Sequence, residues 1–110
     1  MRSPKFLIFR SANADEYHYQ LISEKGEVIL SGQGHTKQNC LKAIASVKKN
    51  AVYESRIERI DTAITFSFNL KSATWAVIGK SPDYTSAALR ELAVLEVKRD
   101  APRALIIEKT

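Results

Sequence analysis

The sequence predicts an α+β fold made of two tandem β-β-β-α repeats, which share one mainly antiparallel sheet with two helices on one face and a C-terminal strand. Two observations lead to this class. Segments of alternating apolar and polar residues precede segments with helical spacing, and the whole pattern occurs twice. The copies are offset by 49 residues in the strands, from Leu21 to Leu70, and by 50 in the helices, from Ile44 to Val94.

The strands are predicted from side chains that alternate in character. Tyr17, Tyr19 and Leu21 recur at every second position, and residues 66–70 repeat this alternation in the second copy. Gly26 suits a hairpin turn, whereas the second copy has Thr74-Trp75 at that place, which leaves its turn geometry open. The predicted strands cover residues 5–10, 16–23, 27–31, 53–60, 63–71, 75–80 and 103–109.

The helices are predicted over residues 36–50 and 85–100, where apolar residues are spaced by three and four. In the first helix this stripe contains Cys40, Ile44 and Val47. Thr36 is the expected N-cap, because a hydroxyl can accept a hydrogen bond from a free backbone N–H of the first turn. Thr85 is its expected counterpart. A length of 110 residues suits one hydrophobic core, so we expect a single domain over 1–110, with repeat one over about 1–51 and repeat two over about 52–110.

Several of these segments, namely 19–21 with 26–29, 44–51, and 66–73 with 78–81, resemble the YegP-like family. The resemblance covers nearly the whole chain in both copies. It implies that the two units join their strands into one sheet, with terminal strands exchanged between units and both helices on one face. The family's function is broadly unassigned, so the resemblance implies a fold and no chemistry. His35 stands where the family usually has a tyrosine such as Tyr84, and we expect it to pack as an aromatic residue would.

The composition is that of an ordinary globular protein. The net charge of +5 permits attraction to polyanions, but acidic and basic residues are interleaved over residues 54–59, as is typical of a solvated strand at a sheet edge. No apolar stretch approaches the length that spans a bilayer, and the single Cys40 cannot form an intramolecular disulfide. We expect a cytoplasmic protein without membrane contact.

Motifs that carry chemistry are weak in this sequence. Cys40 and His35 could form a thiol and base pair, but the helical stripe predicts that Cys40 is buried, so we expect no enzymatic activity. Gly34, Thr36 and Lys37 follow a strand and open a helix, where free N–H groups could hold an anion, although the Walker spacing is absent. The spacing of the histidines and carboxylates predicts no metal site, and no cofactor is expected.

Nucleic-acid binding is the alternative function that the charge suggests. Its candidate residues are basic side chains on helix surfaces and C-terminal turns: Lys42, Lys48, Lys49, Lys98 and Arg99. The sheet does not suit base stacking, because Tyr17, Tyr19, Phe66 and Phe68 share faces that the helices must cover. The polar residues of these strands, Lys71 among them, are expected to face solvent.

The two helices differ in the stripe beside their core residues. The first helix has Gln38, Lys42 and Ala45 there, whereas the second has Ala88, Leu92 and Leu95. Either these leucines pack beneath the C-terminal strand around residues 104–107, or they form a self-association surface. The sequence leaves both a homodimer and a monomer open. Its first functional hypothesis is a non-enzymatic structural or interaction module, with an unidentified protein or a second copy as the partner.

Overall fold

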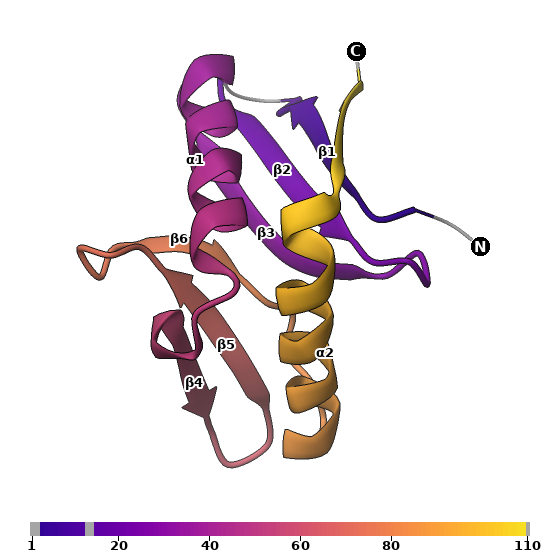
Figure 1. Ribbon diagram of the computed structural model, residues 1–110, viewed down its shortest axis with the longest axis vertical. Coiled ribbons are helices and arrows are strands. Elements are labelled where there is room, and N and C mark those ends of the chain that lie inside the picture. The colour runs from indigo at the N-terminus through magenta and orange to yellow at the C-terminus, as the bar shows by residue number, and fades with distance from the viewer. Residues whose placement is uncertain (1–2, 13–14, 110) are drawn as a thin grey trace.

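The computed structural model describes residues 3–12 and 15–109, and it places two α-helices on one face of a seven-stranded sheet (Figure 1). This is the α+β class that the sequence predicts. The helices are α1 (Lys37–Asn50) and α2 (Ala87–Asp100), and each is followed by a short 3-10 turn, η1 (Glu54–Arg56) or η2 (Ala101–Arg103). The strands are β1 (Lys5–Arg10), β2 (Tyr17–Ile22), β3 (Val28–Gly34), β4 (Ile57–Asp61), β5 (Phe66–Lys71), β6 (Val77–Lys80) and β7 (Leu105–Lys109).

The strand order across the sheet is β4-β5-β6-β3-β2-β1-β7. Two antiparallel meanders, β1-β2-β3 and β4-β5-β6, meet at their third strands. Among the described residues, a single register pair, Ser31 opposite Lys80, joins β3 to β6. The last strand, β7, pairs in parallel with β1, so the sheet is mainly but not purely antiparallel. The second half of the chain therefore supplies the strand that borders the first meander.

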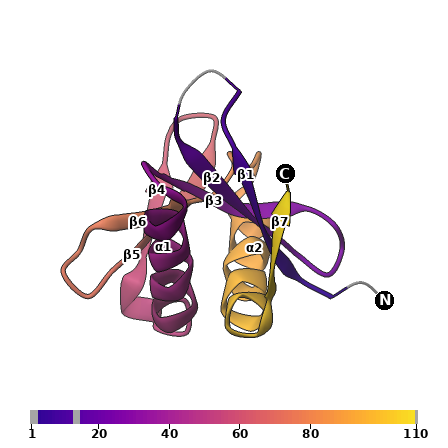
Figure 2. The ribbon, with the colours of Figure 1, turned by 90° about the horizontal axis from the view of Figure 1, so that it is seen from above.

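The core lies between the sheet and the two helices, which are on the same side of the sheet when the molecule is seen from above (Figure 2). Alternation in the strands and the three-four spacing in the helices point large side chains into this layer. The strands contribute Phe6, Tyr19, Leu21, Phe68 and Leu70, and the helices contribute Cys40, Ile44, Val47, Val94 and Val97, all of them buried.

Some predicted boundaries are wrong because local turns replace the ends of strands. The predicted strand over 53–60 begins as a 3-10 turn, in which the Arg56 N–H donates to the Tyr53 carbonyl at 3.0 Å. The caps of the two helices also differ from the prediction at one position. Thr36 caps α1, accepting from the Asn39 N–H at 3.0 Å, but Ser86 and not Thr85 caps α2, because its hydroxyl lies 3.1 Å from the Leu89 N–H.

Lys71 was expected in solvent, and this expectation is wrong. Lys71 keeps the face of Asn69, away from the helices, but it is covered there by Glu58 and Trp75. The Lys71 side chain is only 10% exposed, and its ammonium lies 3.5 Å from a Glu58 carboxylate oxygen. The ammonium also lies 5.1 Å from the centre of the Trp75 ring, which is a cation–π distance.

The hairpin turns of the two meanders have the same geometry despite their different residues. The Gly26 N–H donates to the Ser23 carbonyl at 2.9 Å, and the Trp75 N–H donates to the Ser72 carbonyl at the same distance. Both residues have positive φ, 86° at Gly26 and 69° at Trp75. A bulky side chain rarely adopts this left-handed conformation, so the second turn holds backbone strain that the first does not.

We expect Trp75→Gly to raise the free energy of unfolding by up to about 1 kcal/mol, because release of the strain outweighs the lost contact with Lys71 and the greater freedom of unfolded glycine. The converse change in the matching turn, Gly26→Trp, should lower the free energy of unfolding by about 1 to 3 kcal/mol. Urea denaturation of both variants and the parent measures the two effects. A Trp75→Gly protein less stable than its parent would show that the turn is not strained.

Candidate functional site

The outer side of α2 is an exposed apolar stripe formed by Ala88, Leu92 and Leu95. The side chains of Leu92 and Leu95 are 55% and 61% exposed, whereas Val94 and Val97 on the inner side are buried. The expectation that these leucines pack beneath the C-terminal strand is wrong. Parallel pairing with β1 places β7 at the border of the sheet, so it does not cover the outer side of α2.

The equivalent side of α1 is polar. Its residues Gln38, Lys42 and Ala45 are exposed, as the stripe of α2 is, but they present an amide, an ammonium and one methyl group. The two helices therefore share the same inner apolar face and differ on the side that meets solvent. An exposed apolar stripe on a helix that already has a buried face is typical of a contact surface.

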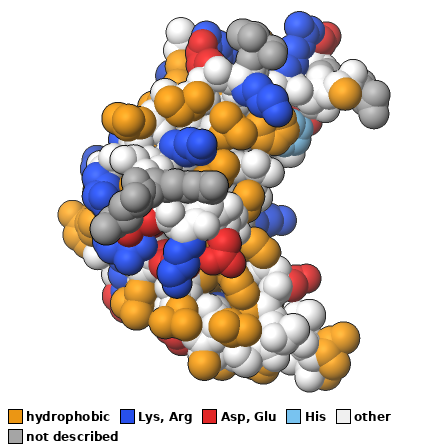
Figure 3. All heavy atoms as spheres, turned by 90° about the vertical axis from the view of Figure 1, so that its right-hand side faces the viewer, with side chains coloured by type: hydrophobic (Ala, Val, Ile, Leu, Met, Phe, Trp, Pro, Cys, Tyr) orange, Lys and Arg blue, Asp and Glu red, His pale blue; other side chains and the backbone are white. Residues whose placement is uncertain are grey.

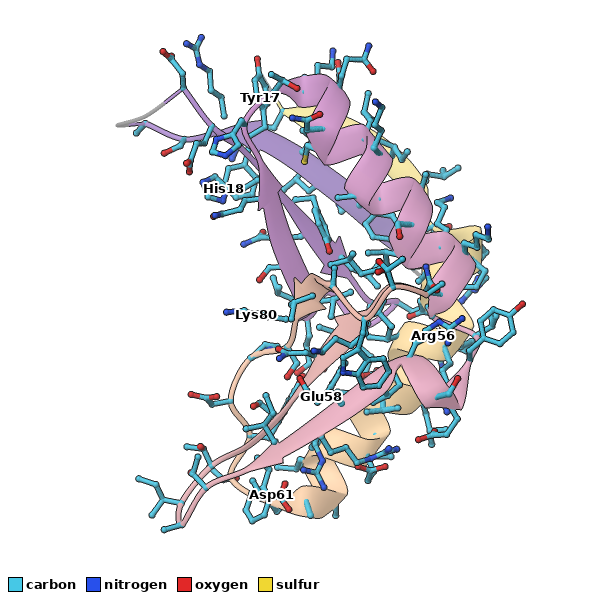
Figure 4. The ribbon with its side chains drawn as sticks, turned by 90° about the vertical axis from the view of Figure 1, so that its left-hand side faces the viewer. Tyr17, His18, Arg56, Glu58, Asp61 and Lys80 are labelled. Atoms are coloured by element: carbon cyan, nitrogen blue, oxygen red, sulfur yellow. The ribbon has the colours of Figure 1, made fainter. Side chains whose placement is uncertain are left out.

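Ion pairs along one flank hold α2 against β4. The Arg59 guanidinium donates to Glu91 on α2, with its Nε 2.8 Å from Oε2, and it also pairs with Glu54. Arg90 of α2 is buried and pairs with Asp61, which lies beside α2 at the end of β4 (Figure 4). These contacts fix which side of the helix faces outward.

The same ion pairs lower the pKa values of two carboxyl groups. Hydrogen bonds from Arg59 and then Lys98 lower the pKa of Glu54 from 4.5 to about 2. The hydrogen bond from Arg59 is also the main cause of the lowered pKa of Glu91. The ionised forms of both groups are therefore favoured in the folded protein.

The C-terminal end of α2 is tied to the first hairpin through Asp100. This carboxylate is fully buried and accepts hydrogen bonds from Arg99 at 2.7 Å and from Arg103 at 3.1 Å. Arg103 also pairs with Glu24 in the turn between β2 and β3. The last residue of α1, Asn50, similarly accepts a hydrogen bond from Arg56 at 3.0 Å. Each helix thus ends on a buried side chain that an arginine of the following segment binds.

The residues of the predicted anion site lie together at the start of α1, and each also has a structural role. Thr36 caps the helix, and Lys37 pairs with Glu108 of β7. A Cβ atom at Gly34 would lie 2.7 Å from the backbone nitrogen of Cys40, so glycine lets the end of β3 pack against the helix.

The structure does not gather the predicted basic residues at one place. Lys42 and Lys49 are exposed on α1, whereas the Lys48 ammonium donates to the Ala104 carbonyl at 2.7 Å. On α2, Lys98 pairs with Glu54, and Arg99 pairs with Asp100. Three of the five cations are therefore held by contacts within the chain.

Cys40 and His35 are in different environments. The Cys40 side chain is fully buried, and burial raises the pKa of its thiol. The expectation that His35 packs as an aromatic residue is wrong, because its side chain is 88% exposed and its Nδ1 lies 3.9 Å from a Glu16 oxygen. Within residues 3–12 and 15–109, no group of three His, Cys, Asp or Glu side chains could hold a metal ion. No helix in the described part of the chain is long and apolar enough to cross a membrane.

Three comparisons with known proteins bear on this arrangement. A sequence model described as "Domain of unknown function (DUF1508)" matches residues 12–58. The "UPF0339 protein in ptx operon 5'region" of Stutzerimonas stutzeri is 39% identical over 97 residues, which cover 86% of this chain and 87% of that protein. The UPF0339 protein YegP of Escherichia coli K12 is 34% identical over 99 residues, or 87% of this chain and 89% of that one. The chain belongs to the YegP-like UPF0339 family.

Solved structures of the family have the same fold. The solution structure of yegP from E. coli, titled a protein of unknown function, has a TM-score of 0.90 at 29% identity and covers all of this chain and 96% of its own. The solution structure of UPF0339 protein SO3888 from Shewanella oneidensis has a TM-score of 0.89 at 29% identity, covering 96% of this chain and 91% of its own.

The lowered pKa values of Glu54 and Glu91 give a defined acid response. A carboxyl group with a lowered pKa in the folded state stabilises the protein above its unfolded value and loses that contribution as the pH falls through the folded value. We expect the free energy of unfolding to fall between about pH 4.5 and about pH 2 because of Glu54. Urea denaturation across this range should show a shallower decline for Glu54→Gln than for the parent. Parallel declines would mean that the Glu54 ion pairs do not contribute.

Proposed function

We propose that the protein is a non-enzymatic interaction module that pairs with a second copy of itself through the outer stripe of α2. The observation that carries this proposal is the exposure of Leu92 and Leu95, each more than half accessible, on a helix whose counterpart is polar at the same positions. Burying a leucine side chain is worth about 1.5 to 3 kcal/mol, so a surface that covers both leucines gains stability.

The spacing of the stripe suits helix pairing about a two-fold axis. Ala88, Leu92 and Leu95 are separated by four and then three residues, which is the repeat of a coiled-coil seam. Two antiparallel copies of α2 would place Leu92 of each beside Leu95 of the other. Glu91 and Lys98 flank the stripe on one side, but both are already paired within the chain, with Arg59 and Glu54, so the contact would rest on the apolar residues. Such an isologous contact is the usual form of a homodimer.

The absence of enzymatic activity is supported by the two environments of the thiol and the imidazole. Cys40 is buried and held in its protonated form, while His35 extends into solvent. A thiol nucleophile needs access to substrate and a base within hydrogen-bonding reach, and here it has neither. Lone Cys40 also agrees with a cytoplasmic location, where disulfides are rare.

We further infer that the single domain descends from two tandem units. The two hairpins share their turn geometry, and each helix ends on a side chain bound by an arginine. The family sequence model covers one strand-strand-helix set, over residues 12–58. Nucleic-acid binding remains an alternative from the sequence; Lys42 and Lys49 alone of its five residues are without a partner among the described residues.

Sedimentation velocity of three proteins tests the pairing. We expect the parent to be a dimer at micromolar concentration and Leu92→Lys with Leu95→Lys to be a folded monomer, because four leucines leave the contact and four charges enter it. The dissociation constant should rise by at least about tenfold, since 1.4 kcal/mol corresponds to that factor.

The matched control adds two lysines at the equivalent exposed positions of α1, Gln38→Lys with Ala45→Lys, and should stay dimeric. A parent that is monomeric at high micromolar concentration would contradict the proposal. Loss of the dimer in the control variant as well would also contradict it, since the effect would then come from net charge.

A further inference from the structure

The face of the sheet away from the helices is concave. Figure 3 shows the molecule as a crescent whose hollow opens on this side. The hollow forms because β3 and β6 share only the pair Ser31 and Lys80 among the described residues and separate beyond it. A cleft of about 570 Å³ lies at this separation, which is within the range of small-molecule sites.

Tyr19 ties together the strands that line the cleft. Its hydroxyl donates to the Ile78 carbonyl at 2.5 Å and so connects β2 to β6 beneath β3. A Cβ atom at Gly32 would come within 2.3 Å of the Tyr19 ring, so glycine at this place lets the ring pass under the strand. Because strand residues and Ala43 of α1 line the cleft and the Tyr19 hydrogen bond ties these strands together, the cleft is preformed.

The walls of the cleft combine one cation with apolar and hydrogen-bonding groups. Lys80 lies at the junction of the two meanders, is exposed, and forms no ion pair with any described residue. Phe9 and His18 are stacked, with ring centroids 5.6 Å apart and planes at 21°. Figure 4 shows His18 and Lys80 on this same concave face. The remaining lining includes Gln20, Ser31, Gln33, Val77 and Ile78.

No acidic residue is among the described residues that line the cleft. The carboxylate of Glu58 lies on the same face of the sheet but is occupied, since Asn69 donates to it at 3.1 Å and the Lys71 ammonium lies 3.5 Å away. The charge that Lys80 presents to the cleft is therefore uncompensated, and it would favour an anion.

We propose that this cleft binds a small aromatic anion, whose carboxylate or phosphate group contacts Lys80 and whose ring packs on the Phe9–His18 pair and Val77. Stacked aromatic side chains and an aliphatic wall suit a planar apolar group, and the amides of Gln20 and Gln33 can orient polar substituents. The site is on the opposite face of the sheet from α2, so it is independent of the proposed dimer.

Two-dimensional ¹H–¹⁵N spectra of the labelled protein test the site, with benzoate and phenyl phosphate as probes and with neutral benzamide and inorganic phosphate as comparisons. We expect saturable shifts of the amides of Ser31, Gln33, Ile78 and Lys80 with at least one aromatic anion. The tighter of benzoate and phenyl phosphate identifies carboxylate or phosphate as the preferred group. Benzamide and inorganic phosphate should each bind at least tenfold more weakly, because benzamide lacks the negative charge and inorganic phosphate lacks the aromatic ring.

Substitutions of exposed lysines then test whether Lys80 is the cation that binds the anion. Lys80→Met should weaken binding of the preferred anion at least tenfold, whereas Lys42→Met, a matched exposed lysine on α1, should leave it unchanged. Lys80→Glu should reverse the preference toward benzylamine, a cation of similar shape. The proposal is overturned if no probe gives saturable shifts in the cleft, if benzamide binds as tightly as benzoate, or if Lys80→Met binds as the parent does.

Discussion

The architecture depends on how the two meanders are joined where β3 meets β6, a very small junction that is called the seam below. Backbone pairing between β3 and β6 is limited to Ser31 and Lys80 in the described chain, which is too little to hold two half-sheets at a fixed angle. The hydroxyl of Tyr19 supplies a further connection, because it crosses beneath Gly32 and donates to Ile78 on the other half. Burial raises the pKa of this hydroxyl, so it remains a donor. The helices pack over the same seam, on the side of the sheet where the Tyr19 ring lies.

The two faces of the sheet acquire different properties from this seam. On the helix side, Leu21, Leu70 and their neighbours are covered by α1 and α2, and ion pairs from β4 set the outward side of α2. On the other side, the divergence of β3 and β6 leaves a hollow that Lys80 lines. One chain thus presents an apolar stripe and a cationic cleft on opposite faces, where two partners could bind without competing.

Local patterns predicted much of the fold. Alternation at Tyr17, Tyr19 and Leu21 and the three-four spacing at Ile44 and Val47 identified the strands, helices and core, because burial on one face imposes these periods. Comparison of the two helices also singled out Leu92 and Leu95, but it left open whether they are covered by the C-terminal strand or exposed, as the structure has them. The cap of α2 was misplaced by one residue because Thr85 and Ser86 are adjacent hydroxyls and sequence alone does not select between them.

Features that depend on contacts distant in sequence could not be predicted in this way. The Tyr19 hydroxyl meets a carbonyl 59 residues away, and no local pattern marks either partner. The cleft arises from the point at which two strands separate, and Lys71 is covered by Glu58 and Trp75, which its own position does not signal. The left-handed Trp75 adopts a turn conformation that Gly26 has in the first meander, so the tertiary arrangement of the strands overrides its local preference.

The stability of Tyr19→Phe tests the seam most directly. The change removes one hydroxyl, keeps the ring under Gly32 and leaves the Ile78 carbonyl without its donor. We expect the free energy of unfolding by urea to fall by about 1 to 3 kcal/mol, the cost of an unsatisfied buried polar group. The exposed Tyr53→Phe, a matched control, should change it by less than about 0.5 kcal/mol. A Tyr19→Phe protein as stable as its parent would contradict the account, because the two half-sheets would then be held together without this bond.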